Sequence, residues 1–449
     1  MLYFGDHYWV AAGISLLLLL LAEAAFYLYV SRVLYPRISP VRKAPRPALE
    51  PARFIERVLH HVVSLKSYDP ADFFTGFFLG AKTEDIRSGN MQSFLAWAMY
   101  SDSLDNLGAA DKVSIGSMVQ RISTVTGISF GPGHNPAVEH IQMTLNSISY
   151  IHRPLVLYMG SAVKNAAGDM LMYLCGFRSG ALGGVTYWVK AAATPSEQAP
   201  MLFFHGISTG WIFYFPLIMN LAGSRPVLLV DLDTIKINSL VFDMPEEADF
   251  CNAVRDICAL HFGADTAVSV VGHSFGTILA AWFLRQQPRL ISHLTLLDPV
   301  SLLLGLPDVA YNFLHKDPDR FTARVIRLMA SREITVSHML HRHFWWYNNV
   351  LWLEDLPPSL SLVIGLSGQD EITNPKLIME YVKVFQESRW DSKQELTSLT
   401  QARTGEITTL YWPNKTHAAV LFDMDAQTGI LKAITASESG AREGASNIK

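Results

Sequence analysis

A short segment near the middle of the chain, residues 267–287, restricts the fold more than any other part of the sequence. It begins with small and β-branched residues at 267–271 and continues with the pentapeptide Gly-His-Ser-Phe-Gly at 272–276. It ends with an apolar helical pattern that stops before Pro288. A serine on a sharp turn between strand and helix needs strained backbone angles, and the residues two places away must lack side chains. The segment therefore predicts a strand–turn–helix unit that lifts the Ser274 hydroxyl above a sheet edge, with the N-terminus of the helix aimed at it.

Composition limits the class of protein. A chain of 449 residues has room for one large domain with additions or for two ordinary ones. Half of its residues are hydrophobic and its mean hydropathy is +0.20, which indicates membrane contact. The net charge of −4 favours neither nucleic acid nor any other polyanionic partner. Cys175, Cys251 and Cys258 show neither metal-ligand spacing nor an even disulfide framework, so we expect buried free thiols.

The N-terminal segment predicts a transmembrane helix at 9–30. Residues 10–30 are apolar apart from Glu23, which is enough to cross a bilayer. The alternative is a cleaved signal peptide, with residues 22–24 as the small-residue site. However, no Lys or Arg precedes the apolar run, whereas five basic residues follow it between positions 32 and 46. By the positive-inside rule, we expect the bulk of the protein to face the cytosol.

Three further segments have simpler predictions. Residues 31–51 are rich in proline and basic residues and predict a linker, either solvated or lying on anionic headgroups. Residues 52–180 predict a helical N-terminal extension, in which Asn90 is the expected N-cap of one helix. Residues 438–449 predict a flexible C-terminal tail.

From residue 185 onward, apolar segments of strand length alternate with helical patterns. The expected strands are 185–190, 201–204, 227–232, 267–271, 293–297, 360–366 and 407–412. One helix is expected to start at 243–246, with Asp243 as its cap. Uniformly apolar strands alternating with helices indicate a mostly parallel sheet covered on both faces, and we place this domain at 181–437.

An alcohol nucleophile needs a base to accept its proton, and the base needs a group to orient it. The strand at 360–366 delivers Asp370 at its carboxyl end, and the strand at 407–412 is followed directly by His417. Both residues therefore leave the same sheet edge as Ser274. We expect His417 to accept the serine proton and Asp370 to hold the imidazole. Glu371 and Asp298, which also follow strands, are the alternatives for the acid.

The oxyanion of an acyl-transfer intermediate needs two backbone N–H donors. One is expected from Phe275, directly after the nucleophile. The other should follow the strand that ends in His205-Gly206, with Ile207 as the first choice and Ser208 as the alternative.

These motifs resemble those of the α/β-hydrolase fold superfamily over residues 185 to 435. The matches, in chain order, are His205-Gly206, the pentapeptide at 272–276, Gly368-Gln369-Asp370 and His417. The resemblance implies an eight-stranded, mostly parallel sheet and esterase, lipase, thioesterase, amidase or related acyl chemistry. The turn at 272–276 corresponds to the nucleophile elbow of this superfamily. Serine at the elbow argues against the epoxide-hydrolase and dehalogenase branches, which use an aspartate there.

The segment at about 300–359 is longer than a strand–helix connection needs and is expected to form a helical cap. Its aromatic residues at 344–347 and 352 either line an acyl pocket or dip into a membrane interface, or they form the core of the cap.

A glycosylation sequon at 414–416 abuts His417, where a glycan would crowd the site, and this favours a cytosolic face. We expect a membrane-anchored serine hydrolase that acts on an apolar or lipid ester without cofactor or metal. An acyltransferase with the same triad and a non-catalytic membrane scaffold are the alternatives.

Overall fold

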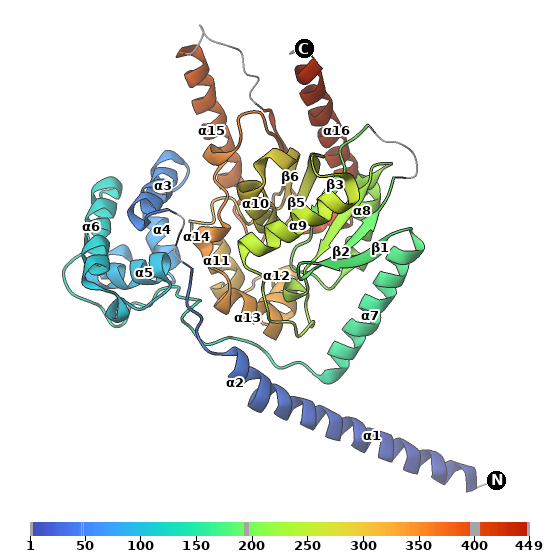
Figure 1. Ribbon diagram of the computed structural model, residues 1–449. Coiled ribbons are helices and arrows are strands. Elements are labelled where there is room, and N and C mark those ends of the chain that lie inside the picture. The colour runs from blue at the N-terminus through green and yellow to red at the C-terminus, as the bar shows by residue number, and fades with distance from the viewer. Residues whose placement is uncertain (1–2, 46, 48, 193–196, 396–404, 447–449) are drawn as a thin grey trace.

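The computed structural model describes residues 3–45, 47, 49–192, 197–395 and 405–446. Its centre is an eight-stranded sheet in the order β1-β2-β4-β3-β5-β6-β7-β8 (Figure 1). The strands are β1 (Arg178–Leu182), β2 (Val185–Lys190), β3 (Met201–Phe204), β4 (Val227–Asp231), β5 (Val268–His273), β6 (Ile291–Leu297), β7 (Ser361–Ser367) and β8 (Ile407–Trp412). β2 is antiparallel to both β1 and β4, and the other neighbours are parallel.

The seven predicted strands are all present, whereas β1 was missed. β1 is mostly exposed and has no apolar pattern, and it lies at the sheet edge, where it pairs with β2. This strand also crosses the boundary that we placed between residues 180 and 181.

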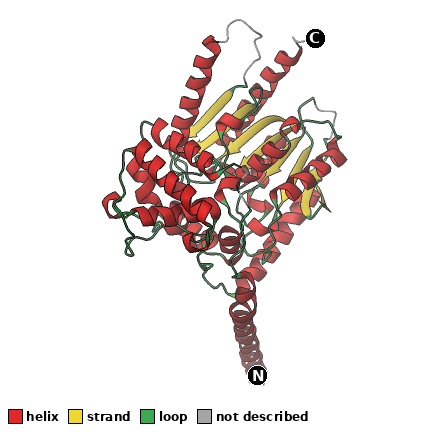
Figure 2. Cartoon of the chain, turned by 60° about the vertical axis from the view of Figure 1, so that its left-hand side comes forward, coloured by secondary structure: helices red, strands yellow, loops and turns green. Residues whose placement is uncertain are grey.

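Helices cover both faces of the sheet, as Figure 2 shows. α9 (Glu247–Phe262), α10 (Gly276–Gln286) and α15 (Pro375–Glu395) pack into one core, and α8 (Phe215–Ala222) and α16 (Met424–Ser446) into another. Successive strand residues point to opposite faces. Phe203 accordingly belongs to the core under α8 and α16, and Phe204 to the other core.

Two helix ends differ from expectation. α9 begins at Glu247 instead of near Asp243, and the side chain of its N-cap residue, Glu246, makes no capping hydrogen bond. The acids Glu247 and Asp249 in the first turn interact favourably with the helix dipole. The expected flexible tail is helical as far as Ser446. Glu438 there forms a 2.7 Å ion pair with the buried Arg225, which holds α16 on the sheet; residues 447–449 lie outside the described part of the chain.

The N-terminal helix is longer than predicted. α1 (Tyr3–Tyr29) continues through a π-helical turn, Val30–Leu34, into α2 (Tyr35–Ile38). The span Tyr8–Ile38 is long and apolar enough to cross a membrane by length and composition. Val30, Leu34 and Ile38 are nevertheless buried against the body of the protein.

The predicted linker at 31–51 is therefore not a free connector. Its first part is helical, and its next part is bonded to the cap. The Arg342 guanidinium donates to the Ser39 carbonyl at 2.9 Å, and the Tyr347 hydroxyl donates to the Pro45 carbonyl at 2.8 Å.

The N-terminal extension contains α3 (Pro51–Ser64), α4 (Pro70–Phe77), α5 (Ser88–Tyr100), α6 (Ala109–Thr126) and α7 (Leu155–Leu174). Asn90 lies in the first turn of α5 rather than at its cap. Its Oδ1 accepts the N–H groups of Arg87 at 3.1 Å and Asn135 at 3.0 Å, which ties a distant turn to the start of the helix.

The cap contains α11 (Asp308–Ala310), a π-helical turn (Tyr311–His315), α12 (Phe321–Ile326), a second π-helical turn (Arg327–Ser331), α13 (Ile334–Arg342) and α14 (Trp346–Asn349). Of its predicted aromatic residues, Phe344, Trp345, Tyr347 and Trp352 are each less than a tenth exposed. The alternative in which they dip into a membrane is wrong, because they pack against the extension and into the core.

Candidate active site

Ser274 stands on the turn between β5 and α10 with a φ of +52°, in the left-handed region that costs a non-glycine residue about 1–3 kcal/mol. The glycines around it are needed because other backbone segments approach closely. A Cβ at Gly276 would lie 2.1 Å from the Phe204 carbonyl oxygen, and one at Gly272 would lie 2.7 Å from the Gly276 oxygen. The local sequence thus builds a turn that presents the serine hydroxyl.

The structure brings three of the predicted residues together. The Ser274 hydroxyl lies 2.8 Å from Nε2 of His417, and Nδ1 of His417 lies 2.8 Å from Oδ2 of Asp370. With the imidazole neutral, Nδ1–H donates to the carboxylate and Nε2 is free to accept the serine proton. The other Asp370 oxygen accepts the N–H groups of Ile372 and Thr373, which fix the carboxylate.

The two alternative acids also lie beside His417, but they contact its backbone and that of its neighbour. Glu371 accepts the His417 N–H at 3.0 Å. Asp298 accepts the Ala418 N–H at 2.9 Å, together with the N–H and hydroxyl of Ser367. They therefore hold the histidine loop, and Asp370 contacts the imidazole ring.

Three carboxylates around one ring determine its charge. Burial acts to lower the pKa of His417, but the charge and hydrogen bond of Asp370, followed by the charges of Asp298 and Glu371, raise that pKa to about 9. Burial also acts to raise the pKa of Asp370, but the His417 charge and the hydrogen bonds lower it, so this carboxylate stays ionised. Burial raises the pKa of Asp298 to about 6.

The two predicted oxyanion donors are on loops next to Ser274. Among the described residues, neither Ile207 N–H nor Phe275 N–H donates a backbone hydrogen bond outside helices and strands. The alternative donor, Ser208 N–H, is already bonded to the Ile235 carbonyl at 3.2 Å. This favours Ile207 over Ser208 as the second donor.

Tyr214 positions the loop that carries Ile207. Nothing in the sequence indicates this role. The Tyr214 oxygen accepts the Gly206 N–H at 2.8 Å, so its own proton goes to Nδ1 of His273 at 2.7 Å. The Gly206 carbonyl lies 2.7 Å from Nδ1 of His205, whose Nε2 accepts the Leu232 N–H. Both polar groups of Gly206 are thus fixed, and the next amide, that of Ile207, is oriented. No sequence signal marked Tyr214, which comes from a separate helical turn.

Asp298, Asp370 and His417 also bring three potential metal-ligand atoms within 4.8 Å of one another. Their oxygens, however, already accept protein N–H and O–H groups, as given above, and a cation cannot replace those donors. The donor set fits proton transfer better than metal binding.

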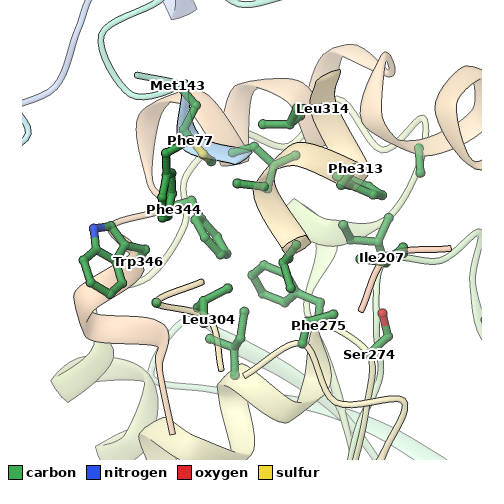
Figure 3. Close-up of a pocket in the computed structure, with 18 of the residues that line it drawn as sticks. Phe77, Met143, Ile207, Ser274, Phe275, Leu304, Phe313, Leu314, Phe344 and Trp346 are labelled. Atoms are coloured by element: carbon green, nitrogen blue, oxygen red, sulfur yellow. The ribbon is translucent and has the colours of Figure 1, made fainter. Parts of the chain in front are cut away.

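Ser274 and His417 line a cavity of about 260 Å³. His417 is hydrogen-bonded to Ser274, which lies at one edge of this cavity (Figure 3). Among its described lining residues, these two are the ones with a hydroxyl or imidazole group; the rest are apolar or aromatic. The indole N–H groups of Trp97 and Trp346 are bonded to Thr144 Oγ1 and to the Ala98 carbonyl. The cavity is therefore an apolar pocket with its reactive groups at one edge.

The N-terminal extension supplies much of the pocket wall. Its contribution consists of Ile55, Val58, Phe73, Phe77, Phe94, Trp97, Ala98, Met99 and Met143. The cap supplies another part of the wall, including Phe313, Phe344 and Trp346. Arg57 ties the two parts together, because it donates two hydrogen bonds to Asp355, at 2.9 and 3.0 Å, and lies 4.4 Å above the Trp352 ring.

Sheet order and elbow together define an α/β protein built to present a serine on a strand–helix turn. A sequence model of the alpha/beta hydrolase fold matches residues 199–376, which include the elbow and Asp370. The domain therefore has the alpha/beta hydrolase fold. A comparison of the sequence with curated proteins finds no match.

Several solved structures are similar to this chain. A putative lipase from Acinetobacter baumannii is 14% identical, with a TM-score of 0.42, over 62% of this chain and 97% of that chain. A carboxylesterase from Bacillus subtilis is 10% identical, with a TM-score of 0.37, over 62% of this chain and 98% of that chain. A haloalkane dehalogenase variant from Bradyrhizobium elkanii is 10% identical, with a TM-score of 0.40, over 61% of this chain and 99% of that chain.

Proposed function

We propose that this protein is a membrane-anchored serine hydrolase that cleaves carboxylic esters with a long apolar acyl chain. The observation that carries the proposal is the 2.8 Å contact between the Ser274 hydroxyl and Nε2 of His417 at the edge of an apolar cavity. A nucleophile and its base within hydrogen-bonding distance, with the base oriented by a third group, are the minimum set for acyl transfer.

In the first half-reaction, His417 accepts the proton of Ser274 as the serine oxygen attacks the ester carbonyl. The N–H groups of Ile207 and Phe275 stabilise the oxyanion, and Asp370 stabilises the imidazolium. His417 then gives the proton to the departing alkoxide, which leaves an acyl-serine. Water, deprotonated by the same imidazole, attacks the acyl carbonyl. The imidazolium then returns this proton to the departing serine oxygen, which releases the acid and regenerates Ser274.

The apolar lining supports an acyl chain as the group in the pocket. Burial of a methylene is worth about 0.8 kcal/mol, so a chain that fills the cavity gains several kcal/mol relative to a short ester. The extension, the cap and the elbow all contribute to the wall, so the pocket needs all three parts.

Packing of α1 supports an anchor over a removed signal peptide. Glu23, within the small-residue site of the signal-peptide alternative, accepts the Leu155 N–H at 2.6 Å. The Phe26 and Tyr158 rings lie 5.0 Å apart. The basic residues that follow α1 and the sequon beside His417 favour a cytosolic catalytic domain.

A fluorophosphonate probe tests the proposal on the full-length protein in detergent. We expect covalent labelling of Ser274, and its loss in Ser274→Ala. Ser117→Ala, which changes an exposed serine on α6, is the matched control and should label like the parent. Folded protein, verified by thermal melting, that does not label at Ser274 would contradict the proposal. Product analysis with competing alcohols separates hydrolysis from acyl transfer.

A further inference from the structure

The outward face of α7 carries an apolar stripe. The stripe residues, spaced three or four apart as on one helix face and all exposed, are Val156, Met159, Gly160, Val163, Ala167, Met170 and Leu174. Val163 is 71% exposed and Leu174 73%. A surface helix of a soluble domain normally turns its charged face outward and its apolar face to the core. In α7 the apolar face points outward instead.

The side of α7 that faces the protein is made of small, polar and a few apolar residues. Gly168 and Met172 are buried there, and the Ser161 hydroxyl accepts a hydrogen bond from the Asn238 amide at 2.9 Å. The helix is therefore attached by the side that a soluble protein would expose. A continuous exposed apolar surface of this kind marks an interaction site.

The cap also has exposed apolar residues close to the start of α7. Phe321, Val325 and Leu328 lie at i, i+4 and i+7 of the continuous helical segment formed by α12 and the π-helical turn after it, and they are 80, 41 and 50% exposed. The residues just before α7 bind this segment, because Ile151 N–H donates to the Arg332 carbonyl at 2.9 Å and Arg153 donates to the Leu328 carbonyl.

The same corner of the molecule is where α1 leaves the body. Glu23 accepts hydrogen bonds from the Leu155 N–H and from the His152 ring, and residues 8–22 are exposed. Figure 1 shows α1 and α7 diverging from this corner. The part of α1 up to Ala22 is about 30 Å long, the thickness of a hydrocarbon core. A bilayer crossed by that part ends near Glu23, where α7 begins.

We infer that α7 and the cap residues Phe321, Val325 and Leu328 form a bilayer-docking face, in which α7 lies in the interfacial layer next to the anchor. Continuity with the membrane span identifies lipid as the occupant. Val325 both lines the catalytic cavity and is 41% exposed, so the cavity reaches this face. The ester accordingly enters from the lipid. The docking rests on the membrane anchor of the proposed function, and only the entry of the ester rests on its catalytic part.

Depth measurements on single-cysteine variants test the docking face. Cys175→Ser removes the half-exposed thiol, while burial raises the pKa of the Cys251 and Cys258 thiols to about 12 and keeps them unreactive. Val163→Cys is labelled with the fluorophore NBD in this background. Val113→Cys is the matched control, since Val113 is a 70% exposed valine on α6 of the extension.

The labelled proteins are reconstituted in vesicles of phosphatidylcholine and phosphatidylglycerol. We expect nitroxide-labelled lipid to quench the probe at 163 at least fivefold more than the probe at 113, and aqueous cobalt to show the reverse order. A probe at 163 as accessible to cobalt as that at 113 would overturn the inference. Shielding from both quenchers, with self-quenching between copies, would also overturn it, because the occupant would then be a second chain.

A second measurement keeps docking and catalysis apart. Val163→Glu should lower hydrolysis of a vesicle-embedded long-chain ester at least tenfold and leave a water-soluble short ester unchanged, and Val113→Glu should change neither. Equal rates for both variants on the embedded ester would overturn the inference. Absence of hydrolysis of both esters by the parent protein, with the probe at 163 still quenched by lipid, would instead contradict the proposed function alone.

Discussion

The hydroxyl of Tyr214 donates a 2.7 Å hydrogen bond to Nδ1 of His273, the residue directly before the elbow serine. The same oxygen accepts the Gly206 N–H, so one side chain links the nucleophile strand to the oxyanion loop. Burial, followed by the nearby charge of His417, lowers the pKa of His273 to about 3, so this imidazole stays neutral. His273 is thus an acceptor within a positioning network and does not compete with His417 as a base.

Removal of this hydroxyl should loosen the oxyanion loop. Tyr214→Phe leaves two buried polar groups unsatisfied, at about 1–3 kcal/mol each. We expect a lower melting temperature and a roughly tenfold loss of kcat with little change in KM. Tyr68→Phe is the control, because the Tyr68 hydroxyl is buried without a hydrogen-bond partner among the described residues. Equal kcat for the two variants would refute the positioning role.

The pH dependence of activity should reflect the acids around His417. The base must be neutral to act, and its pKa is raised to about 9, so kcat/KM should increase with pH on an acid limb well above 6.5. Asp298→Asn removes a negative charge that favours the imidazolium, so the limb should move to lower pH. Asp308→Asn, a change at a half-buried acid that accepts a hydrogen bond from the Asn374 amide, should leave the limb in place. An unshifted limb in Asp298→Asn would show that Asp298 does not act on the base.

The extension should set acyl-chain length. Met143 and Phe77 lie on the far side of the pocket from Ser274 in Figure 3. Met143→Phe should remove room for one or two methylenes, which are worth about 0.8 kcal/mol each. We expect the kcat/KM ratio of long to short esters to fall roughly tenfold. The control is Met424→Phe at an exposed methionine on α16. A chain-length profile equal to that of the control would mean that substrate does not reach the extension.

The contact between extension and cap should be measurable in stability. Arg57→Ala removes the paired hydrogen bonds to Asp355 and the contact with Trp352, and should cost about 1 kcal/mol in denaturant unfolding. Arg57→Lys should not restore the loss fully, since an ammonium lacks the planar fork. Arg121→Ala, whose partner Glu56 lies within the extension itself, should cost less. Equal losses would contradict a role for Arg57 at the junction.

Much of the fold could be predicted because its signals are local. Each predicted strand is an apolar run of the right length, and the elbow is marked by glycines that a close backbone approach requires. Asp370 and His417 could be placed as candidates because parallel strands bring the residues after their carboxyl ends to one edge. β1 gave no such signal, because its five residues are mostly exposed and show no apolar pattern.

The rest of the site depends on contacts between distant segments, which leave no local pattern. In the sequence, Phe77 and Trp97 are simply apolar residues of expected helices. Nothing in the sequence indicates that they line a cavity. Tyr214 lies 59 residues before His273. In the sequence, Glu23 is only an interruption of an apolar run. In the structure, its carboxylate accepts a hydrogen bond from the N–H of Leu155, the first residue of α7, 132 residues later.

The half-exposed position of Val325 in the cavity wall has a consequence for turnover. With the inferred docking, an acyl chain that passes this residue would leave the bilayer and return to it without crossing water. The rate is then governed by the mole fraction of ester among the lipids and not by its molar concentration in the buffer. The released fatty acid stays in the same leaflet, where it dilutes the substrate and competes for the same opening.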